Sequence, residues 1–503
     1  MNICLLNDSF PPVIDGVVNV VLNYAKYLMQ DHGAQIVVGT PNYPGADYSV
    51  YDFPVIPYQS FDTAAVTSGY RTGNPFSEKS VSALARTKPD IIHTHCPASA
   101  TVIARILREE CQAPVVFTYH TKYDIDIRRV VKAEPLAREG IKAMVSNISA
   151  CDDVWVVSRG AGENLRDLGF QGDYLVMNNG VDFDRGRVDE AEVARVCAGY
   201  DLPEDVPVYL FVGRMMTYKG LPLILDALRL VKDAGQDFRM VFIGKGPDLE
   251  LLQEKARELG LMDEEAAGDG ENIISGGKCI FLGAIYDRDV LRAWNTRADL
   301  FLFPSTFDTN GLVVREAAAC GLASVLIKDS CAAEGVTNGR NGFIIEENAQ
   351  AMADLLLKVS GDLSHLKQVG DHAMNEIYLS WQTCVAQAYD RYQILLEKKR
   401  EGLLGSKIKQ PTDYLVSMTA RGMSERDRIR RLGEEWFNGF KESAVGMMEN
   451  VQEFEEEAHQ LTERVKGAVS ESVKETMQER KKAAEKMREE IRKETSYEKS
   501  SMN

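Results

Sequence analysis

Short apolar runs alternate with amphipathic helical patterns along most of the chain. In the first 200 residues, apolar runs predict strands, and longer stretches with apolar residues three or four apart predict helices between them. The predicted strands are Ile3–Asn7, Gln35–Gly39, Asp90–His95, Pro114–His120 and Val154–Ser158, and the predicted helices are Val17–Gln30, Ala98–Glu110 and Arg138–Ala150. Strands that alternate with helices of this length indicate a parallel sheet covered by helices.

The same pattern starts again after residue 200. Strands are predicted at Val206–Gly213, Phe238–Gly244, Lys278–Leu282, Leu300–Pro304 and Ser324–Ile327, and helices at Leu221–Ala234, Leu249–Leu259, Asp287–Thr296 and Gly311–Cys320. The chain therefore predicts two doubly wound α/β units, residues 1–200 and 201–375. Ligands of such sheets bind at the carboxyl ends of strands, so residues directly after each strand are the first candidates for chemistry.

The last part of the chain has a different composition. Residues 401–503 contain 19 Lys+Arg and 21 Asp+Glu and no cysteine, which predicts a charged helical tail. The apolar positions Val451, Phe454, Ala458, Leu461, Val465 and Ala468 keep a three-four spacing only for about three turns. Three interpretations stay open: a solvated helix beside the globule, a partner-binding or oligomerising helix, and a helix on a membrane surface.

Composition and charge exclude several classes of protein. The 503 residues carry a formal charge of −17, which argues against a nucleic-acid binder with a wholly basic surface. Apolar residues make up 45% of the chain, but no run of 18 predicts a transmembrane span. The segment Met1–Phe10 reads as a first strand and not as a signal peptide. Nine cysteines without CxxC spacing are typical of buried thiols in a reducing compartment, so we expect a soluble cytoplasmic enzyme.

The segment Phe303–Gly321 is the most informative for chemistry. A strand is predicted to end at Pro304 and a helix to start at Gly311, so backbone N–H groups of the helix start can face a phosphate. Asp308 and Glu316 lie eight residues apart, in the loop and inside the helix, and both can point at one ligand.

Four further segments also follow predicted strands. Arg214 and Lys219 in VGRMMTYKG are two cations at a turn before a helix, which suits a departing diphosphate. Gly16 opens a helix after a proline-rich turn, Gly244 and Gly246 lie in the turn GKGP, and His120 ends a strand in FTYHTKY. Taken singly, each pattern also fits an ordinary loop or a surface charge.

Together these segments resemble the family-4 (group 1) glycosyltransferases, which are retaining enzymes of the GT-B fold. The resemblance rests on the glycine turn at Gly16, the cation pair Arg214 and Lys219, the GxGP turn and the spacing of Asp308 and Glu316. It covers residues 1–395, and among its members the bacterial diacylglycerol glucosyltransferases are the most similar in character. It implies an acceptor-binding first unit (1–200), a nucleotide-sugar-binding second unit (201–375) and crossover helices over 376–400.

The resemblance also implies a role for each matching residue. Arg214 and Lys219 would neutralise the leaving diphosphate without a metal or other cofactor, and Glu316 would hold the ribose hydroxyls. Asp308 and His120 would bind the transferred sugar. The donor-binding residues would be Gly16, Gly244, Gly246, Asn310, Gly311, Leu312 and Glu316.

The sequence departs from the family pattern at two of these positions. Asp308 stands where a Glu is usual, which bears on the sugar that is transferred, and Asp15–Gly16 stands where two glycines are common. Three D-x-D strings, Asp124–Asp126, Asp182–Asp184 and Asp287–Asp289, are chance occurrences rather than metal sites, because alternate carboxylates of an extended segment point to opposite sides.

The acceptor is predicted from a basic and apolar segment, Asp124–Val145. It carries Arg128, Arg129 and Lys132 beside apolar residues, a composition suited to docking on an anionic bilayer, and His95 is a candidate acceptor contact. We expect transfer of glucose from UDP-glucose to a lipid such as diacylglycerol, peripherally at the inner face of the cell membrane. The alternatives are a transferase for soluble or polysaccharide acceptors, for example from GDP-mannose, and a nucleotide-sugar-binding scaffold without turnover.

Overall fold

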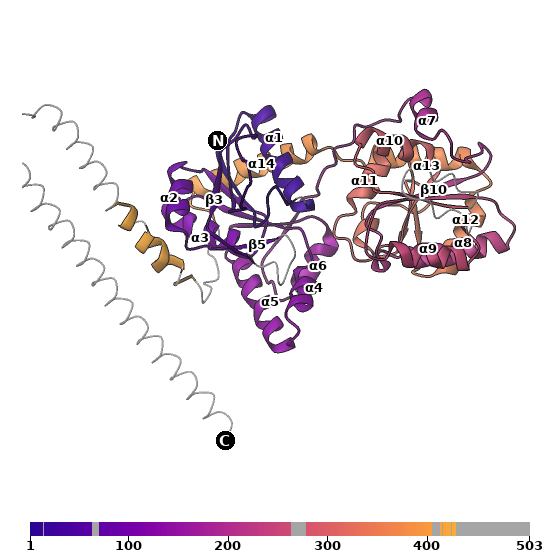
Figure 1. Cartoon of the computed structure of the whole chain (residues 1–503). Coiled ribbons are helices and arrows are strands. Elements are labelled where there is room, and N and C mark those ends of the chain that lie inside the picture. Colours follow the sequence, from indigo (N-terminus) through magenta and orange to yellow (C-terminus); the bar gives the residue numbers. More distant parts are fainter. Residues whose placement is uncertain are drawn as a thin grey trace, which may run out of the picture.

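The computed structural model describes residues 1–13, 15–62, 70–262 and 278–404, together with 413–428 apart from 415 and 424. Two parallel sheets, each flanked by helices, form two units that lie side by side (Figure 1). This arrangement confirms the predicted α/β class with two doubly wound units. Residues 429–503, which include the predicted apolar stripe from Val451 to Ala468, lie outside the described residues.

The first sheet has seven strands in the order β3-β2-β1-β6-β7-β8-β9, and each neighbouring pair is parallel. Its strands are β1 (Asn2–Leu6), β2 (Gln35–Pro41), β3 (Val55–Tyr58), β6 (Ile91–Thr94), β7 (Val115–Tyr119), β8 (Asp153–Val156) and β9 (Leu175–Val176). Its helices are α1 (Gly16–His32), α2 (Glu78–Arg86), α3 (Ser99–Cys111), α4 (Tyr123–Val130), α5 (Glu134–Ser149) and α6 (Arg159–Asp167), and β4 (Ser60–Asp62) pairs antiparallel with β5 (Arg71–Gly73).

The second sheet has six parallel strands in the order β12-β11-β10-β13-β14-β15. They are β10 (Val208–Val212), β11 (Arg239–Ile243), β12 (Cys279–Gly283), β13 (Leu300–Phe303), β14 (Ser324–Ile327) and β15 (Phe343–Ile345). The helices are α7 (Glu190–Val196), α8 (Leu221–Asp233), α9 (Leu249–Glu258), α10 (Arg288–Arg297), α11 (Leu312–Ala319), α12 (Ala349–Val359) and α13 (Leu363–Glu376). In both sheets the strand order reverses next to the first strand, and a doubly wound sheet binds ligands at that point.

The chain enters the second unit earlier than the predicted boundary at residue 200. Phe183 is buried in the core of the second unit, and the ring of Tyr200 packs edge-on against Trp294 with centroids 5.3 Å apart. The reason is that these aromatic side chains find their apolar partners there, while the intervening α7 is polar and buries none of its residues.

The chain returns to the first unit through α14 (Trp381–Arg400), which packs on α1. Tyr24 of α1 meets Trp381 edge-on at 6.4 Å, and His32 stacks on Tyr389 at 4.1 Å. The outgoing and returning segments touch where the N–H of Val181 donates to the carbonyl of Leu379 at 2.9 Å. Both crossings therefore lie at one place between the units.

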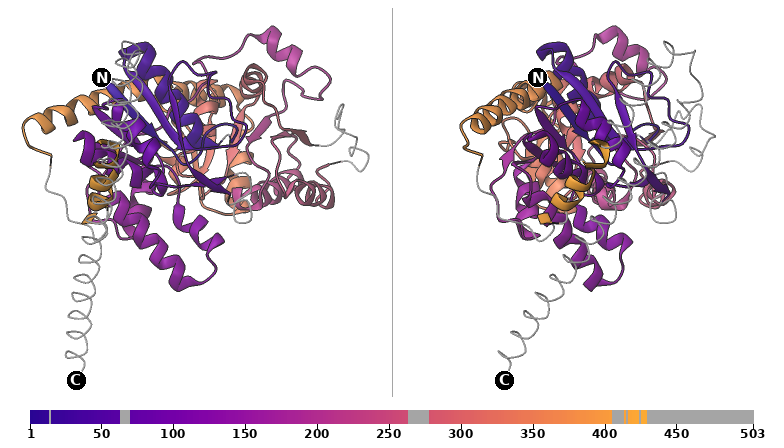
Figure 2. Two further views of the ribbon diagram at one scale, coloured as in Figure 1. Left: turned by 60° about the vertical axis from the view of Figure 1, so that its left-hand side comes forward. Right: turned by 90° about the vertical axis from the view of Figure 1, so that its left-hand side faces the viewer.

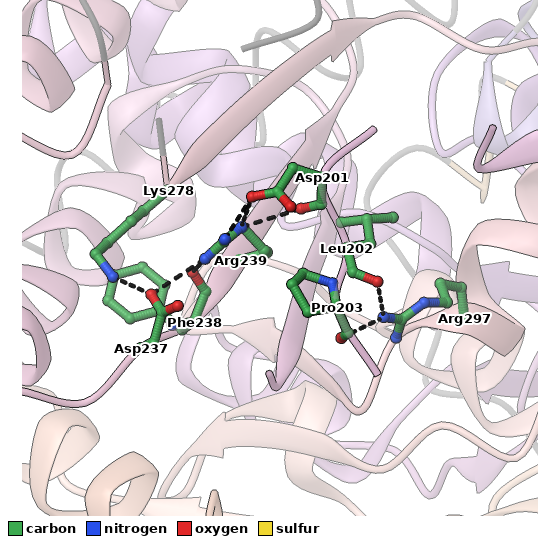
Figure 3. A network of polar contacts seen from close by, with 8 residues as sticks. All are labelled: Asp201, Leu202, Pro203, Asp237, Phe238, Arg239, Lys278 and Arg297. Atoms are coloured by element: carbon green, nitrogen blue, oxygen red, sulfur yellow. Dashed lines mark hydrogen bonds and ion pairs between the residues drawn. The ribbon is translucent and has the colours of Figure 1, made fainter. Parts of the chain in front are cut away.

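A network of charges fixes the segment that leads into β10 (Figure 3). Arg239 donates to the carboxylate of Asp201 at 2.5 Å and to that of Asp237 at 3.1 Å, and Lys278 also pairs with Asp237. Arg297 donates to the carbonyl oxygens of Leu202 and Pro203 at 3.0 and 3.2 Å. These bonds hold residues 201–203 against the amino end of the second sheet, opposite to the end where ligands bind.

The first described part of the tail packs on the first unit. This position differs from one of the interpretations left open above, a solvated helix beside the globule. The helical segment 413–428 buries Val416, Ala420 and Met423 in the core of that unit (Figures 1 and 2). Asp413 accepts from the fully buried Arg105 at 2.7 Å. This correction concerns only the described part of the tail.

Charged contacts also occupy part of the basic patch Arg421–Arg431, in which the sequence carries five Arg against Glu425 and Asp427. Asp427 is buried and lies 3.4 Å from Arg86, and Arg426 lies 3.6 Å from Glu78. Arg428 pairs with Glu425 at 2.5 Å. Since these arginines face acidic groups of the chain itself, the described half of the patch offers less positive charge to a membrane than the sequence suggests.

Removal of the Asp413 carboxylate tests this docking. We expect Asp413→Ala to lower the free energy of unfolding by about 1–3 kcal/mol, because the guanidinium of Arg105 then loses a charged partner inside the protein. Urea unfolding followed by tryptophan fluorescence measures the change. The matched control is Glu425→Ala, which breaks an exposed pair with Arg428 and should change stability by less than about 0.5 kcal/mol. Equal stability of the two variants would contradict the docking.

Candidate active site

Loops from three adjacent strands of the second sheet bring the predicted cations and carboxylates together. Arg214 and Lys219 follow β10, Asp308 follows β13, and the turn Gly244–Pro247 follows β11. Because β11, β10 and β13 are neighbours in a parallel sheet, their carboxyl ends lie at one edge. The sequence predicted only that these residues follow strands, and the order of the strands in the sheet explains why they lie at one edge.

The two glycines of the GKGP turn have a packing reason. A Cβ atom at Gly244 would lie 1.8 Å from the carbonyl oxygen of Gly213, and one at Gly246 would lie 2.2 Å from that of Met215. The N–H of Met215 donates to the carbonyl of Lys245 at 3.1 Å. The turn thus supports the loop that carries Arg214, while direct donor binding by the two glycines stays a prediction.

Lys219 forms an ion pair with Asp308. Its Nζ donates to both carboxylate oxygens, at 2.6 and 2.7 Å, and the hydroxyl of Ser305 donates to Oδ2 at 2.6 Å. The two charged side chains are only 14% and 24% exposed, so the pair is partly shielded from water. Arg214, in contrast, is exposed near the start of the loop that follows β10. A diphosphate bound here would meet Arg214 at once and would compete with Asp308 for Lys219.

Glu316 pairs with a residue that the sequence reasoning missed. Arg288, the first residue of α10, donates to its carboxylate at 2.8 Å. Burial raises the pKa of Glu316, and the positive charge of Arg288 opposes that rise. Around Arg288 the sequence offered only the string Asp287–Asp289, which does not predict the pair with Glu316. In the structure Asp287 caps α10 and accepts from the N–H groups of Asp289 and Val290 at 2.9 and 3.2 Å.

The start of α1 differs from an open phosphate cradle. The carboxylate of Asp15 accepts from the N–H groups of Val17 and Val18 at 2.9 and 2.8 Å, so it already satisfies two donors of the helix start. Its other oxygen accepts from Ser9 at 2.9 Å and from Tyr70 at 3.0 Å. Binding of a nucleotide sugar at this turn would therefore depend on the backbone N–H of Gly16, which lies beside the negative charge of Asp15.

His120 lies at the carboxyl end of β7, where the two units meet. Its backbone carbonyl accepts from the hydroxyl of Thr309 at 2.6 Å, which links it to the loop that carries Asp308. Its Nε2 lies 3.0 Å from Nδ1 of His95, and burial lowers the pKa of His120 to about 3. The ring is therefore neutral at physiological pH. His95 itself is fully buried, so it has no direct access to an acceptor.

Two further contacts join the units beside His120. Both oxygens of the Glu334 carboxylate accept from the N–H groups of Arg159 and Gly160 at 2.7 Å, at the start of α6. The side-chain amide of Asn310 donates to the carbonyl of Val157 at 3.3 Å and accepts from Asn179 at 3.2 Å. The neighbouring Gly311 caps α11 in a left-handed conformation, with φ of 59°, and Leu312 begins that helix.

The predicted basic segment forms two helices rather than one. It breaks between α4 and α5, where Val131 has an extended backbone and Pro135 lies in the first turn of α5. Arg128 faces Asp124 at 3.1 Å and Glu134 at 3.4 Å, which reduces its charge toward the outside, while Lys132 is exposed. For Arg129, only the place in α4 is described. No set of three His, Cys, Asp or Glu side chains is arranged around a metal position within the described ranges.

Two family models match the chain in the same order as the two sheets. The model described as Glycosyltransferase Family 4 matches residues 14–185, and that described as Glycosyl transferases group 1 matches residues 206–362, together about two thirds of the chain. The chain belongs to the family-4, group 1 glycosyltransferases. The fold that the resemblance implied is likewise present in solved GT-B structures. The structure of Anabaena Alr3699/HepE in complex with UDP covers 78% of this chain and 100% of that chain, with a TM-score of 0.60 at 18% identity.

Two relatives bear on the substrates of this glycosyltransferase. The alpha-monoglucosyldiacylglycerol synthase of Acholeplasma laidlawii is 24% identical over 422 residues, which cover 79% of this chain and all of the relative. The GDP-mannose-dependent alpha-(1-6)-phosphatidylinositol monomannoside mannosyltransferase of Mycolicibacterium smegmatis is 24% identical over 71% of this chain and 88% of its own length. These names describe the relatives: the first specifies a glucosylated diacylglycerol, and the second specifies GDP-mannose and a phosphatidylinositol mannoside.

The ion pair of Lys219 with Asp308 generates a prediction about nucleotide binding. We expect Asp308→Asn to bind UDP about fivefold more tightly than the wild type, equivalent to ~1 kcal/mol, because it removes a carboxylate that competes with phosphate for Lys219. Isothermal titration calorimetry measures this. The control Asp226→Asn removes an equal charge from the pair between Asp226 on α8 and Lys255 on α9, and it should leave UDP affinity unchanged. Unchanged or weaker binding by Asp308→Asn would contradict a phosphate site at Lys219.

Proposed function

We propose that this glycosyltransferase moves a hexose from a nucleotide sugar such as UDP-glucose to the hydroxyl of a membrane lipid such as diacylglycerol. The proposal includes retention of configuration at the sugar and no requirement for a metal ion. One observation carries it: Lys219, Asp308 and His120 come from both units and are joined through a single loop. Asp308 of that loop contacts Lys219, and Thr309 contacts the backbone of His120. In the proposal Lys219 would serve the phosphate, Asp308 the sugar hydroxyls and the neutral imidazole of His120 the sugar.

The cations would serve the leaving group. When the bond between C1 of the sugar and the phosphate oxygen breaks, its electron pair goes to the diphosphate, and Arg214 and Lys219 would stabilise the added negative charge. The acceptor oxygen then bonds to C1 on the same face, and its proton passes to an oxygen of the leaving phosphate. Two side-chain cations would thus provide the charge that a divalent ion provides in other transferases.

The carboxylates and the histidine would hold the donor. Once the diphosphate takes Lys219, Asp308 is free to accept hydrogen bonds from sugar hydroxyls. Glu316, in the middle of α11, would accept from the ribose hydroxyls, and a neutral His120 would hydrogen-bond the sugar at the reacting face. The relative that acts with GDP-mannose favours a second candidate, a mannosyltransferase with the same chemistry and a different base and sugar.

The helices α4 and α5 supply the argument for a lipid acceptor. They project from the first unit as a pair (Figure 1), and next to their connection Val130 is 44% and Leu136 is 66% exposed. The exposed Lys132 lies between them in the chain. Apolar side chains beside a cation suit insertion at the headgroup boundary of an anionic bilayer. The Acholeplasma laidlawii relative, whose name specifies a glycolipid product, supports the same acceptor class. Among the described helices none is long and apolar enough to cross a membrane.

Release of UDP separates an enzyme from a binding scaffold. We expect UDP release from UDP-glucose with diacylglycerol vesicles, unchanged by EDTA, and about 100-fold slower in Lys219→Ala because the leaving group loses a cation. Parallel reactions with GDP-mannose and with soluble acceptors, analysed by product mass spectrometry, identify donor and acceptor. Binding of nucleotide sugars without turnover of any of them would support the scaffold, and transfer to soluble acceptors only would remove the lipid.

Membrane docking has its own test. We expect Leu136→Asp to weaken sedimentation with anionic liposomes about tenfold, because it puts a carboxylate where an apolar side chain would be buried. The control Leu251→Asp changes another exposed leucine, 56% exposed, on α9 of the second unit and should sediment like the wild type. If both variants sediment as well as the wild type, the tip of α4 and α5 is not the docking surface.

A further inference from the structure

Three histidines cluster at the carboxyl ends of β6 and β7, and their hydrogen bonding differs. His93 has a partner for each ring nitrogen, since Nδ1 lies 2.6 Å from the hydroxyl of Tyr392 and Nε2 lies 2.7 Å from that of Thr118. In His95 and His120 only one ring nitrogen each has a hydrogen-bond partner: Nδ1 of His95 and Nε2 of His120 lie 3.0 Å apart. Their remaining nitrogens, Nε2 of His95 and Nδ1 of His120, are buried and have no hydrogen-bond partner within the described part of the chain.

The bond between His95 and His120 constrains where both protons lie. Two neutral imidazoles carry two N–H groups on four nitrogens, and one N–H must lie in the shared bond. If Nδ1 of His95 donates, Nδ1 of His120 carries the second proton and is a donor. If Nε2 of His120 donates, its Nδ1 is an acceptor and the second proton is on Nε2 of His95. The tautomer of His95 therefore decides what His120 offers to a ligand.

We propose that His95 is a positioning residue for His120, which sets its ring orientation and selects the hydrogen-bonding character of its free nitrogen, Nδ1. This inference rests on the proposed function, because it assigns to that nitrogen a hydroxyl of the bound hexose as the partner it lacks. A hydroxyl both donates and accepts, so it matches either tautomer of the pair. The role replaces direct contact of His95 with the acceptor.

The hydrogen bond between His95 and His120 orients the His120 ring, while other bonds hold the backbones of the two residues. The backbone of His120 is held by Thr309, and that of His95 by two bonds: its N–H donates to Leu6 at 2.9 Å, and its carbonyl accepts from Tyr123 at 3.3 Å. Burial lowers the pKa values of both rings well below the ordinary range, which keeps them neutral. In a buried environment a single hydrogen bond between neutral rings is a strong orienting contact.

Substitution of His95 in two backgrounds tests the inference in the full-length protein. The amide of Asn places a donor and acceptor near the position of Nδ1, so His95→Asn should keep kcat for hexose transfer within about threefold, whereas His95→Ala should lower it roughly 100-fold. KM for the donor should change little. In a His120→Ala background, His95→Ala should have no further effect, since it acts only through that ring. Thermal unfolding of every variant is measured in parallel, and His93→Gln is the control for a histidine with a structural role.

Each outcome decides the matter. Rescue by Asn together with loss of the effect in the His120→Ala background supports positioning. Equal rate losses for Ala and Asn, or additive losses in the double variant, would overturn it, as would losses that simply follow thermal stability as in His93→Gln. Should the wild type transfer no sugar from any donor, the proposed function fails first. The two failures are therefore distinguishable.

Discussion

Four consecutive residues after β13 connect nearly all the chemistry of this molecule. Asp308 binds Lys219, Thr309 binds the backbone of His120, Asn310 binds Val157 and Asn179, and Gly311 caps α11. The loop is short and begins at a buried strand, so its residues have little freedom relative to the second sheet. Through them the position of that sheet determines the distance between a cation of one unit and a histidine of the other.

In the free protein, carboxylates of the chain satisfy the groups that would bind the donor. Lys219 faces Asp308, and Arg288 faces Glu316. A formal charge of −17 offers a diphosphate no general attraction, so its binding depends on exchanging these local partners. In such an exchange a phosphate would replace the carboxylate on the lysine, and sugar hydroxyls would replace the lysine as hydrogen-bond donors to the carboxylate. The exposed Arg214 would provide a first contact without such an exchange.

The strands that carry the site could be predicted because each is an almost continuous apolar run, and a parallel sheet buries such runs on both faces. Of the residues that follow these strands, Lys219 and Asp308 form an ion pair. Edge strands such as β3, β9 and β15 are short and were missed, since two to four residues carry no periodic signal. Asp15 did have a local signal, because Asp before a helix start is a preferred cap.

Long-range ion pairs could not be predicted in the same way. Arg288 and Glu316 are 28 residues apart, and Arg105 and Asp413 are 308 apart. Any acidic residue on the surface satisfies the sequence rule for a partner, so only the packing of helices decides which one is chosen. For the same reason, composition suggested a free, charged tail, although residues 413–428 contribute three apolar side chains to the first core.

The contacts between the facing loops explain how such a site can both hold and release substrates. Glu334, Thr309 and Asn310 cross the interface through hydrogen bonds. When such an interface opens, water replaces each bond, and the net cost is about 1 kcal/mol apiece. Opening an apolar interface would instead cost free energy in proportion to the apolar area that becomes exposed to water. Polar contacts on both sides of His120 would therefore allow the units to separate at a small cost. They also fix the register in which the units meet, because each hydrogen bond has a direction that the apolar effect lacks.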